Sequence, residues 1–111
     1  MENKNLYPTV TRELAEQRAS LAPEIIQSWN NFSKTVLKEG ALSEKTKQLI
    51  AVAVAHVTQC PYCIRSHTKS ALRKGATREE IMETIWVASE MRAGAAYAHS
   101  VIAIDEMEKQ Q

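Results

Sequence analysis

A stretch without any charged side chain, from Gln48 to Ile64, constrains the fold of this chain more than any other feature. Its first part contains a run of seven apolar residues, Leu49 to Ala55. A helix that is apolar on every side is normally buried on every side. A chain of 111 residues buries roughly two thirds of its unfolded surface, which leaves one modest core for this helix. We therefore expect a second subunit to provide part of the cover, and we predict a homo-oligomer.

Apolar residues recur at three- and four-residue intervals along most of the chain, which is the spacing of amphipathic helices. Only three glycines and three prolines are present, too few for a turn-rich β fold. We predict an all-α, single-domain bundle of about six helices over residues 1–111. Gly94 is expected to weaken or interrupt the helical segment near the C-terminus, and a separate last helix is expected to follow it.

Several residues are expected to begin helices. Ser43 is a candidate N-cap, and Pro61 suits the first position of a helix whose cap is Cys60. Thr77 and Glu80 have the spacing of a capping box. In the helix that follows, the residues expected to face inward are Ile81, Ile85 and Ala88, with Trp86 as a further candidate.

The balance of charges argues against a polyanionic partner. Fourteen basic and thirteen acidic residues leave a formal net charge of +1, too little to attract nucleic acid or an anionic membrane. A membrane span needs about 20 apolar residues, and the N-terminus lacks the apolar segment of a signal peptide. We expect a cytoplasmic protein with no nucleic-acid or membrane partner. The sequence has no Gly-rich phosphate loop, and we expect no cofactor.

The two cysteines, Cys60 and Cys63, lie close together in the sequence. A bridge between them closes too small a loop to hold a fold together. On a helix the two thiols lie within reach of a disulfide, and His67 follows Cys63 by one turn on the same face. A helix N-terminus stabilises a thiolate, and Arg65 and Lys69 add positive charge nearby. The segment thus contains a nucleophile, a resolving thiol and a base, the parts of a dithiol redox site.

Two other interpretations of this segment remain open. His56, Cys60, Cys63 and His67 are four residues of types that bind zinc, although zinc ligands usually come from two separate segments. Alternatively, the two cysteines are small packed residues without chemistry. Under either interpretation the chain is a non-catalytic binding or structural protein.

Two segments together resemble the core of a known family. The sequence KTKQLIAVAVA (residues 45–55), followed by CPYCIRSH (residues 60–67), is similar to the carboxymuconolactone decarboxylase superfamily, most closely to its alkylhydroperoxidase D-like (AhpD-like) branch. Ala71, residues 75–77 and residues 79–81 continue the pattern, and the resemblance covers about residues 40–90. It implies an all-helical fold, assembly into trimers or hexamers, and a cysteine-dependent peroxidase or disulfide reductase in antioxidant defence.

The resemblance also implies roles for single residues. Cys63 resembles the thiol that a peroxide oxidises to sulfenic acid, and Cys60 resembles the thiol that resolves it into a disulfide. His67 resembles the histidine that helps deprotonate the pair. The expected substrate is a peroxide or a disulfide, and an unidentified thiol reductant is expected to reopen the Cys60–Cys63 bond.

Two supporting positions depart from the pattern of the well-studied peroxidases. Gln48 stands where they have a glutamate, and Tyr62 stands where they have a histidine. A glutamine still orients His67 through a hydrogen bond, but it does not accept a proton as a carboxylate does. Glu90 is a candidate for a replacement carboxylate. These departures also motivate an alternative, a superfamily enzyme acting on a small organic substrate; lactone decarboxylation is not expected, because that branch typically lacks the cysteine pair.

Overall fold

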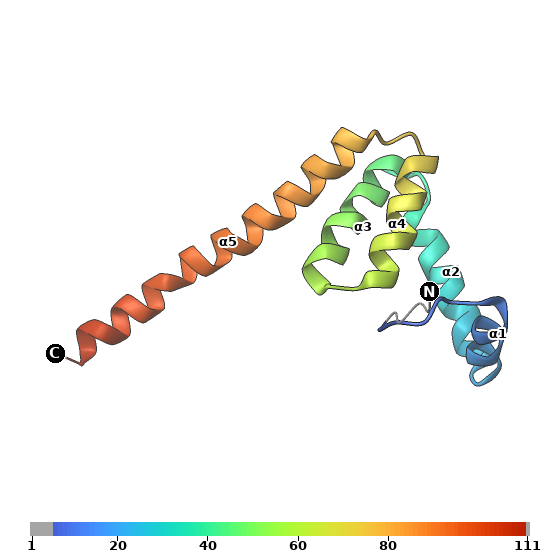
Figure 1. Cartoon of the computed structure of the whole chain (residues 1–111), viewed down its shortest axis with the longest axis horizontal. Helices are drawn as coiled ribbons and strands as arrows, with labels where there is room; N and C mark the ends of the chain where they lie inside the picture. Colours follow the sequence, from blue (N-terminus) through green and yellow to red (C-terminus); the bar gives the residue numbers. More distant parts are fainter. Residues whose placement is uncertain (1–5, 111) are drawn as a thin grey trace, which may run out of the picture. The chain divides into compact units, whose positions relative to one another are not determined.

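The computed structural model describes residues 6–110, which form five α-helices and no strand (Figure 1). In chain order the helices are α1 (Arg12–Ser20), α2 (Pro23–Leu37), α3 (Glu44–Thr58), α4 (Pro61–Arg73) and α5 (Arg78–Lys109). The chain divides into two compact units, one ending at Val36 and the other beginning at Leu37. The all-α class expected from the sequence is confirmed.

The N-terminal unit contains α1 and most of α2. Thr11 begins α1, because its hydroxyl oxygen accepts a hydrogen bond from the backbone N–H of Leu14 at 3.2 Å. α2 is amphipathic, yet no residue of α1 or α2 is buried. The apolar row of α2 is exposed and consists of Ile25, Trp29, Phe32 and Val36. The cysteines lie in the other unit, which has the core.

In the C-terminal unit, α3 packs against both α4 and α5. Val52, in the middle of the uncharged stretch, is fully buried, and burying a side chain of this kind contributes about 1.5–3 kcal/mol. The residues of this core are Val52, Ala71, Ala76 and Ile81, with Leu49 and Ile85 packed against them. α3 is therefore the central element of the unit that holds the cysteines.

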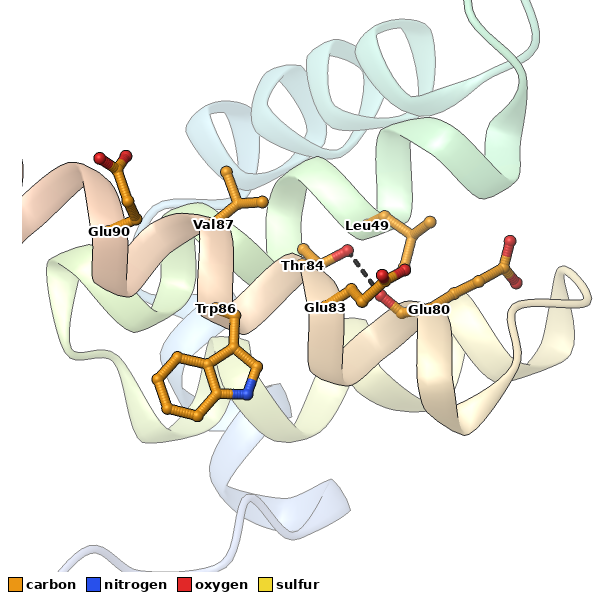
Figure 2. Close-up of a pocket in the computed structure, with 7 residues that line it drawn as sticks. All are labelled: Leu49, Glu80, Glu83, Thr84, Trp86, Val87 and Glu90. Carbon is orange, nitrogen blue, oxygen red and sulfur yellow. Dashed lines mark hydrogen bonds between the residues drawn. The ribbon is translucent and has the colours of Figure 1, made fainter.

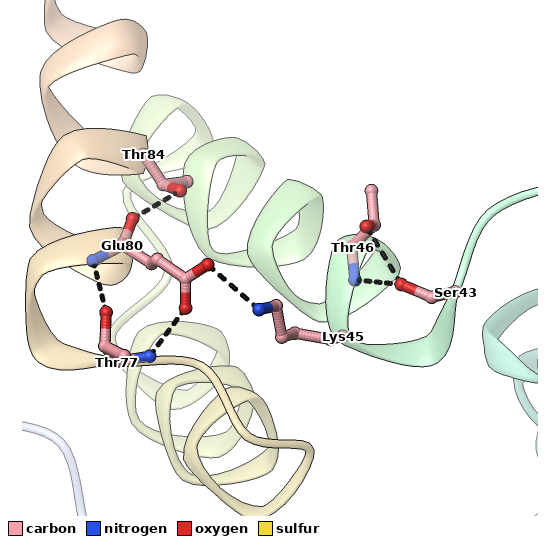
Figure 3. A network of polar contacts seen from close by, with 6 residues as sticks. All are labelled: Ser43, Lys45, Thr46, Thr77, Glu80 and Thr84. Carbon is pink, nitrogen blue, oxygen red and sulfur yellow. Dashed lines mark hydrogen bonds and ion pairs between the residues drawn. The ribbon is translucent and has the colours of Figure 1, made fainter.

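The first turns of α3 and α5 are capped and joined to each other (Figure 3). The hydroxyl of Ser43 accepts from the N–H of Thr46 at 3.1 Å, and Thr77 and Glu80 form the predicted capping box at 2.8 and 3.0 Å. Glu80 also binds Nζ of Lys45 at 2.9 Å. The backbone N–H of Thr77, and then Lys45, hold the pKa of the Glu80 carboxyl below its ordinary value of 4.5.

α4 ends just before a glycine. Its last helical residue is Arg73, and Gly75 follows with a φ of 93°, in the left-handed region that glycine adopts without steric cost. An ion pair between Lys74 and Glu44 joins this end of α4 to the start of α3. α3 is thus tied at its first turn to both of the helices that pack on it.

α5 corrects the predicted number of helices. It runs as one helix of 32 residues, so Gly94 lies inside it and the described residues contain five helices where the sequence suggested about six. A glycine costs a helix interior about 1 kcal/mol relative to alanine. Ala93 and Ala95 flank Gly94, and alanine is the residue with the highest helix propensity. One glycine in that setting is too weak a signal to end the helix.

The inward face of α5 is largely the predicted one. Ile81 and Ala88 are buried and Ile85 packs against the core, but Trp86 is 66% exposed and does not face inward. Beyond Ala88 the helix extends past the residues with which it packs, and its apolar side chains there are exposed. These side chains are Met91, Tyr97, Val101, Ile102, Ile104 and Met107.

The uncharged stretch is not buried on every side within one chain. Val52 and Ala55 are buried, whereas Ile50 and Val54 on the other side of α3 are 47% and 52% exposed. Within the single chain α3 is therefore covered on one side, and its cover by a second subunit stays a prediction. Within residues 6–110, no helix combines the length and apolar content that a membrane span requires.

Candidate dithiol site

The structure brings Cys60 and Cys63 together in a disulfide at the start of α4. Their Cα atoms are 5.2 Å apart, an ordinary separation for a bridged pair. Cys60 is the N-cap residue, and its Sγ accepts a hydrogen bond from the backbone N–H of Cys63 at 3.2 Å. Pro61 occupies the first position of the helix, as predicted. The pair therefore sits where the free N–H groups of a helix stabilise negative charge on sulfur.

The turn that presents the cysteines depends on Gln59, which sequence reasoning missed as part of the site. Gln59 is the C-cap of α3 and adopts a left-handed conformation with a φ of 57°. The backbone N–H groups of Gln59 and Cys60 both donate to the carbonyl oxygen of Ala55. The left-handed residue reverses the chain in one step, so that α4 begins directly after α3. The usual sequence signal for a left-handed residue at the end of a helix is a glycine or an asparagine, and position 59 has a glutamine instead.

His67 is anchored to α3 by Gln48. Its Nδ1 lies 2.7 Å from Oε1 of Gln48, and Gln48 is buried with 7% of its surface exposed. An amide oxygen only accepts hydrogen bonds, so Nδ1 carries the hydrogen and Nε2 is the basic nitrogen of the neutral ring. Cys63 and His67 are one turn apart on the same helical face, a separation of about 5–6 Å between Cβ atoms. The structure thus has the expected hydrogen bond between His67, the predicted base, and Gln48 on α3.

The remaining predicted residues near the thiols lie on α4. Tyr62 lies between the two cysteines in the first turn and is half-buried. Arg65 and Lys69 are exposed on the next two turns. The first turn of α4 contains no acidic residue, so no carboxylate of its own opposes a thiolate there. The electrostatic setting favours the anionic form of a cysteine.

Glu90 belongs to a different feature, an open groove of about 660 Å³ beside α3 and α5 (Figure 2). The groove is lined by Leu49, Glu80, Glu83, Thr84, Trp86, Val87 and Glu90. Oε1 of Glu90 points along its own helix toward Gly94, whose added Cβ would lie 3.5 Å from it. The hydrogen-bond partner of His67 is Gln48, and the residues that line the groove do not include either cysteine.

The four residues of the zinc interpretation do not form a ligand set in this structure. Nδ1 of His56 binds the carbonyl oxygen of Val52 in its own helix at 2.7 Å, and the two sulfurs are bonded to each other. Among residues 6–110, no group of three or more His, Cys, Asp or Glu side chains is placed to hold a metal ion. The geometry of this state is that of an oxidised dithiol.

Comparison with known proteins finds sequences and structures that are similar to the part of the chain that contains the site. The sequence model of the carboxymuconolactone decarboxylase family matches residues 23–106, which contain Gln48, both cysteines and His67. A protein of Paracoccus denitrificans, described as uncharacterized protein 4 in cox locus, is 71% identical over 69 residues. That match covers 62% of this chain and 62% of the relative, so the chain spans less than two thirds of that protein.

Two solved structures extend the similarity to the fold. A carboxymuconolactone decarboxylase family protein of Legionella pneumophila has a TM-score of 0.67 and 36% identity, over 87% of this chain and 86% of the other. A family protein of Thermotoga maritima has a TM-score of 0.56 and 26% identity, over 79% of this chain and 97% of the other. The Thermotoga protein is described as a candidate participant in an antioxidative response. Both similarities cover most of this chain.

Proposed function

This chain belongs to the carboxymuconolactone decarboxylase family, and we propose that it is a thiol-dependent peroxidase or disulfide reductase. One observation carries the proposal: the Cys60–Cys63 bond lies at the start of α4, one turn before a histidine that a buried amide holds in place. The antioxidative description of the Thermotoga relative supports the same chemistry. We place the reaction in antioxidant defence in the cytoplasm, where thiols are kept reduced.

In the proposed cycle, Cys60 and Cys63 begin as thiols. Nε2 of His67 takes the proton of Cys63, and the resulting thiolate attacks one oxygen of the peroxide. The O–O bond breaks, Cys63 becomes a sulfenic acid, and the other oxygen leaves as water or an alcohol after it gains a proton. Cys60 then attacks the sulfur of Cys63 and releases water, which forms the disulfide. With a disulfide as substrate, Cys63 forms a mixed disulfide and Cys60 displaces the second thiol.

Gln48 influences this cycle through its hydrogen bond and through its lack of charge. Its oxygen keeps the hydrogen on Nδ1 of His67, which leaves Nε2 available as the base. An uncharged amide does not stabilise the imidazolium as a carboxylate does. The start of α4 therefore supplies much of the stabilisation of the thiolate. We infer that this chain reacts more slowly with peroxide than a relative with a glutamate at the same position.

The proposal is tested by counting free thiols after the reduced protein is mixed with peroxide. The wild type should lose both thiols per chain as the disulfide forms. Cys60→Ser should lose its one remaining thiol and trap a sulfenic acid at Cys63, which a dimedone probe detects by mass spectrometry. Cys63→Ser is the matched control, and its remaining thiol should react much more slowly.

Two outcomes contradict the proposal. In the first, the wild type keeps both thiols in the presence of peroxide and of a small disulfide such as oxidised glutathione. In the second, Cys63→Ser consumes peroxide as fast as the wild type, which would remove Cys63 from the role of nucleophile. Far-UV circular dichroism of each variant shows whether the helices are intact.

We also propose that the chain acts as a homo-oligomer, a trimer or hexamer. A stripe of Ile50, Val54 and Val57 on α3 is 45–52% exposed, and the apolar side chains of the last turns of α5 are exposed as well. Contiguous apolar surface of this kind usually marks an interaction site. Light scattering should give a mass of three or six times 12.4 kDa; a monomer would contradict the proposal.

A further inference from the structure

The amide of Gln48 has a second polar atom, Nε2, that the protein itself does not use. Its Oε1 accepts the hydrogen on Nδ1 of His67, but no hydrogen bond within residues 6–110 involves Nε2. Gln48 is buried, with only 7% of its surface exposed. In this part of the chain, every side-chain nitrogen or oxygen that is closed off from solvent has a hydrogen-bond partner, so Nε2 is open to solvent. The site therefore holds two free N–H groups beside the histidine that acts as its base.

The helices that hold the thiols carry almost no negative charge. None of the 13 acidic residues lies between Lys45 and Arg78, a segment that includes almost all of α3 and the whole of α4. Two carboxylates at its borders, Glu44 and Glu80, are each bound by a lysine. The carboxylates of the groove beside α5 line a surface that includes neither cysteine (Figure 2). Together with the N–H groups at the start of α4, this distribution makes the site favourable for an anion.

The neutral amide also favours one of the two proposed reactions over the other. An amide does not take up a proton, so Gln48 does not pass a proton to or from His67. Cleavage of a peroxide releases a hydroxide or an alkoxide, a strong base that needs a proton as it leaves. Cleavage of a disulfide releases a thiolate, which is a weaker base and leaves more readily without one. A histidine held by an amide is therefore better suited to a disulfide than to a peroxide.

We propose that the substrate is a small disulfide with a carboxylate close to its S–S bond. This inference rests on the proposed redox function and selects one of its two reactions. The N–H groups on Nε2 of Gln48 bind the carboxylate while the S–S bond lies over Cys63. A hydrogen bond to a charged group is stronger than one between neutral groups. A glutamate at position 48 would place a negative charge there and repel the same substrate.

The reaction is a thiol–disulfide exchange that begins with both cysteines as thiols. Nε2 of His67 takes the proton of Cys63, and the thiolate attacks one sulfur of the substrate. The S–S bond of the substrate breaks, and its other half leaves as a thiolate that takes a proton. Cys60 then loses its proton and attacks the sulfur of Cys63, which releases the second half of the substrate and forms the Cys60–Cys63 bond. Two electrons and two protons pass from the cysteines to the substrate, which becomes two thiols.

The experiment compares disulfides of nearly equal size that differ in charge. Dithiodipropionate carries carboxylates, hydroxyethyl disulfide is neutral and cystamine carries ammonium groups. The full-length protein is reduced, freed of reductant and mixed with each, and the loss of its thiols is followed at about pH 8, where a glutamate is ionised. Each rate constant is divided by that of dithiothreitol, an uncharged thiol, with the same disulfide. The wild type should prefer dithiodipropionate to cystamine by at least about tenfold.

Substitutions at position 48 test whether the amide causes this preference. Gln48→Glu should lower it at least about tenfold, because the carboxylate repels the anionic disulfide and attracts the cationic one. Gln48→Met has neither the N–H groups nor a charge, and it should lower the preference at least about threefold. The loss of the partner of His67 slows all the disulfides alike, so it cancels in the ratio. The matched control, Gln27→Glu, adds the same charge at an exposed position of α2 and should keep the wild-type preference.

The possible failures are distinguishable. If the wild type reduces none of the disulfides and also keeps its thiols with hydrogen peroxide, the redox function itself is wrong. If it reacts with all the disulfides at equal relative rates, or with cystamine fastest, only the substrate class is wrong. A higher relative rate with hydrogen peroxide than with dithiodipropionate would overturn the choice of a disulfide.

A preference that Gln48→Met retains in full would overturn the binding of the carboxylate by the amide. Salt provides a second check on that contact. In about 1 M salt the Debye length is about 3 Å, so attraction by distant surface charges is lost, and the wild type should still show at least about a threefold preference. A preference that disappears in this salt would assign it to surface charges and contradict the proposal. Far-UV circular dichroism shows whether each variant keeps its helices.

Discussion

Nδ1 of His67 lies 2.7 Å from Oε1 of Gln48, so a buried amide on α3 sets the tautomer of the histidine on α4. The two residues are 19 positions apart in the sequence. The hydrogen bond couples the packing of α3 on α4 to the chemistry of the thiol site, because a change at a core position of α3 alters the base beside Cys63. This coupling is open to a direct test by substitution of Gln48.

We expect Gln48→Glu to raise the rate of thiol loss with peroxide by roughly tenfold, because a carboxylate stabilises the imidazolium that forms when His67 takes a proton. Gln48→Leu should lower that rate by about tenfold and reduce the free energy of unfolding by about 1–3 kcal/mol, since Nδ1 loses its buried partner. Stopped-flow thiol kinetics and urea denaturation measure the two effects. Equal rates for both variants would show that Gln48 does not act through His67.

The sulfur of Cys60 has a structural role that is separate from redox chemistry, because it caps α4. In the reduced protein, Cys60→Ser should keep this cap, since serine is a preferred N-cap residue. Cys60→Ala leaves the N–H of Cys63 without its partner and should unfold with about 1 kcal/mol less free energy than Cys60→Ser. Thermal unfolding under dithiothreitol compares the two variants, neither of which forms the disulfide. Identical midpoints would mean that the cap does not stabilise α4.

Features of this fold that depend on neighbouring residues were predictable from the sequence. The capping box of Thr77 and Glu80, the cap at Ser43 and the helix start at Pro61 are short patterns with one local explanation each, and the structure has all three. Gly94 failed as a local signal because flanking alanines outweigh it. A single glycine has no fixed meaning without its context.

Contacts between residues that are far apart in the sequence were harder to predict. The ion pair of Lys45 and Glu80 spans 35 residues, and no sequence pattern specifies such a pair. The hydrogen bond between Gln48 and His67 was foreseen only because the resemblance to a family put the two positions in one site. Tertiary packing decides these points, and a helical pattern alone does not contain it.

Glu80 makes part of the stability dependent on pH. Its pKa is lowered in the folded state by the backbone N–H of Thr77 and by Lys45. A carboxyl group of this kind stabilises the fold above its unfolded pKa, and the contribution is lost as the pH falls through the lowered folded pKa. We expect Glu80→Gln to lower Tm at pH 7, and the difference from wild type to shrink from about pH 5 downward.

The control for this effect is Glu79→Gln, an exposed substitution in the same helical turn. It removes the same charge but none of the hydrogen bonds to Thr77 and Lys45. The Tm difference between this variant and the wild type should be much smaller at pH 7. The result that would contradict this is an equal decrease in Tm, relative to wild type, for both variants at pH 7 and at each lower pH. The interaction of the charges with the helix dipole, rather than the network around Glu80, would then explain the pH dependence.

Two glycines should respond in opposite directions to alanine. At Gly94 an added Cβ lies 3.5 Å from Oε1 of Glu90, an ordinary contact, and the backbone is helical. Gly94→Ala should therefore raise the free energy of unfolding by about 0.5–1 kcal/mol, because alanine has less conformational freedom to lose. At Gly75 no atom lies within 4 Å, but the φ of 93° is one that L-residues rarely adopt, so Gly75→Ala should lower the same quantity by about 1 kcal/mol or more. Urea denaturation at matched protein concentration compares them, and a loss of stability at Gly94 would show that α5 is not a continuous helix there.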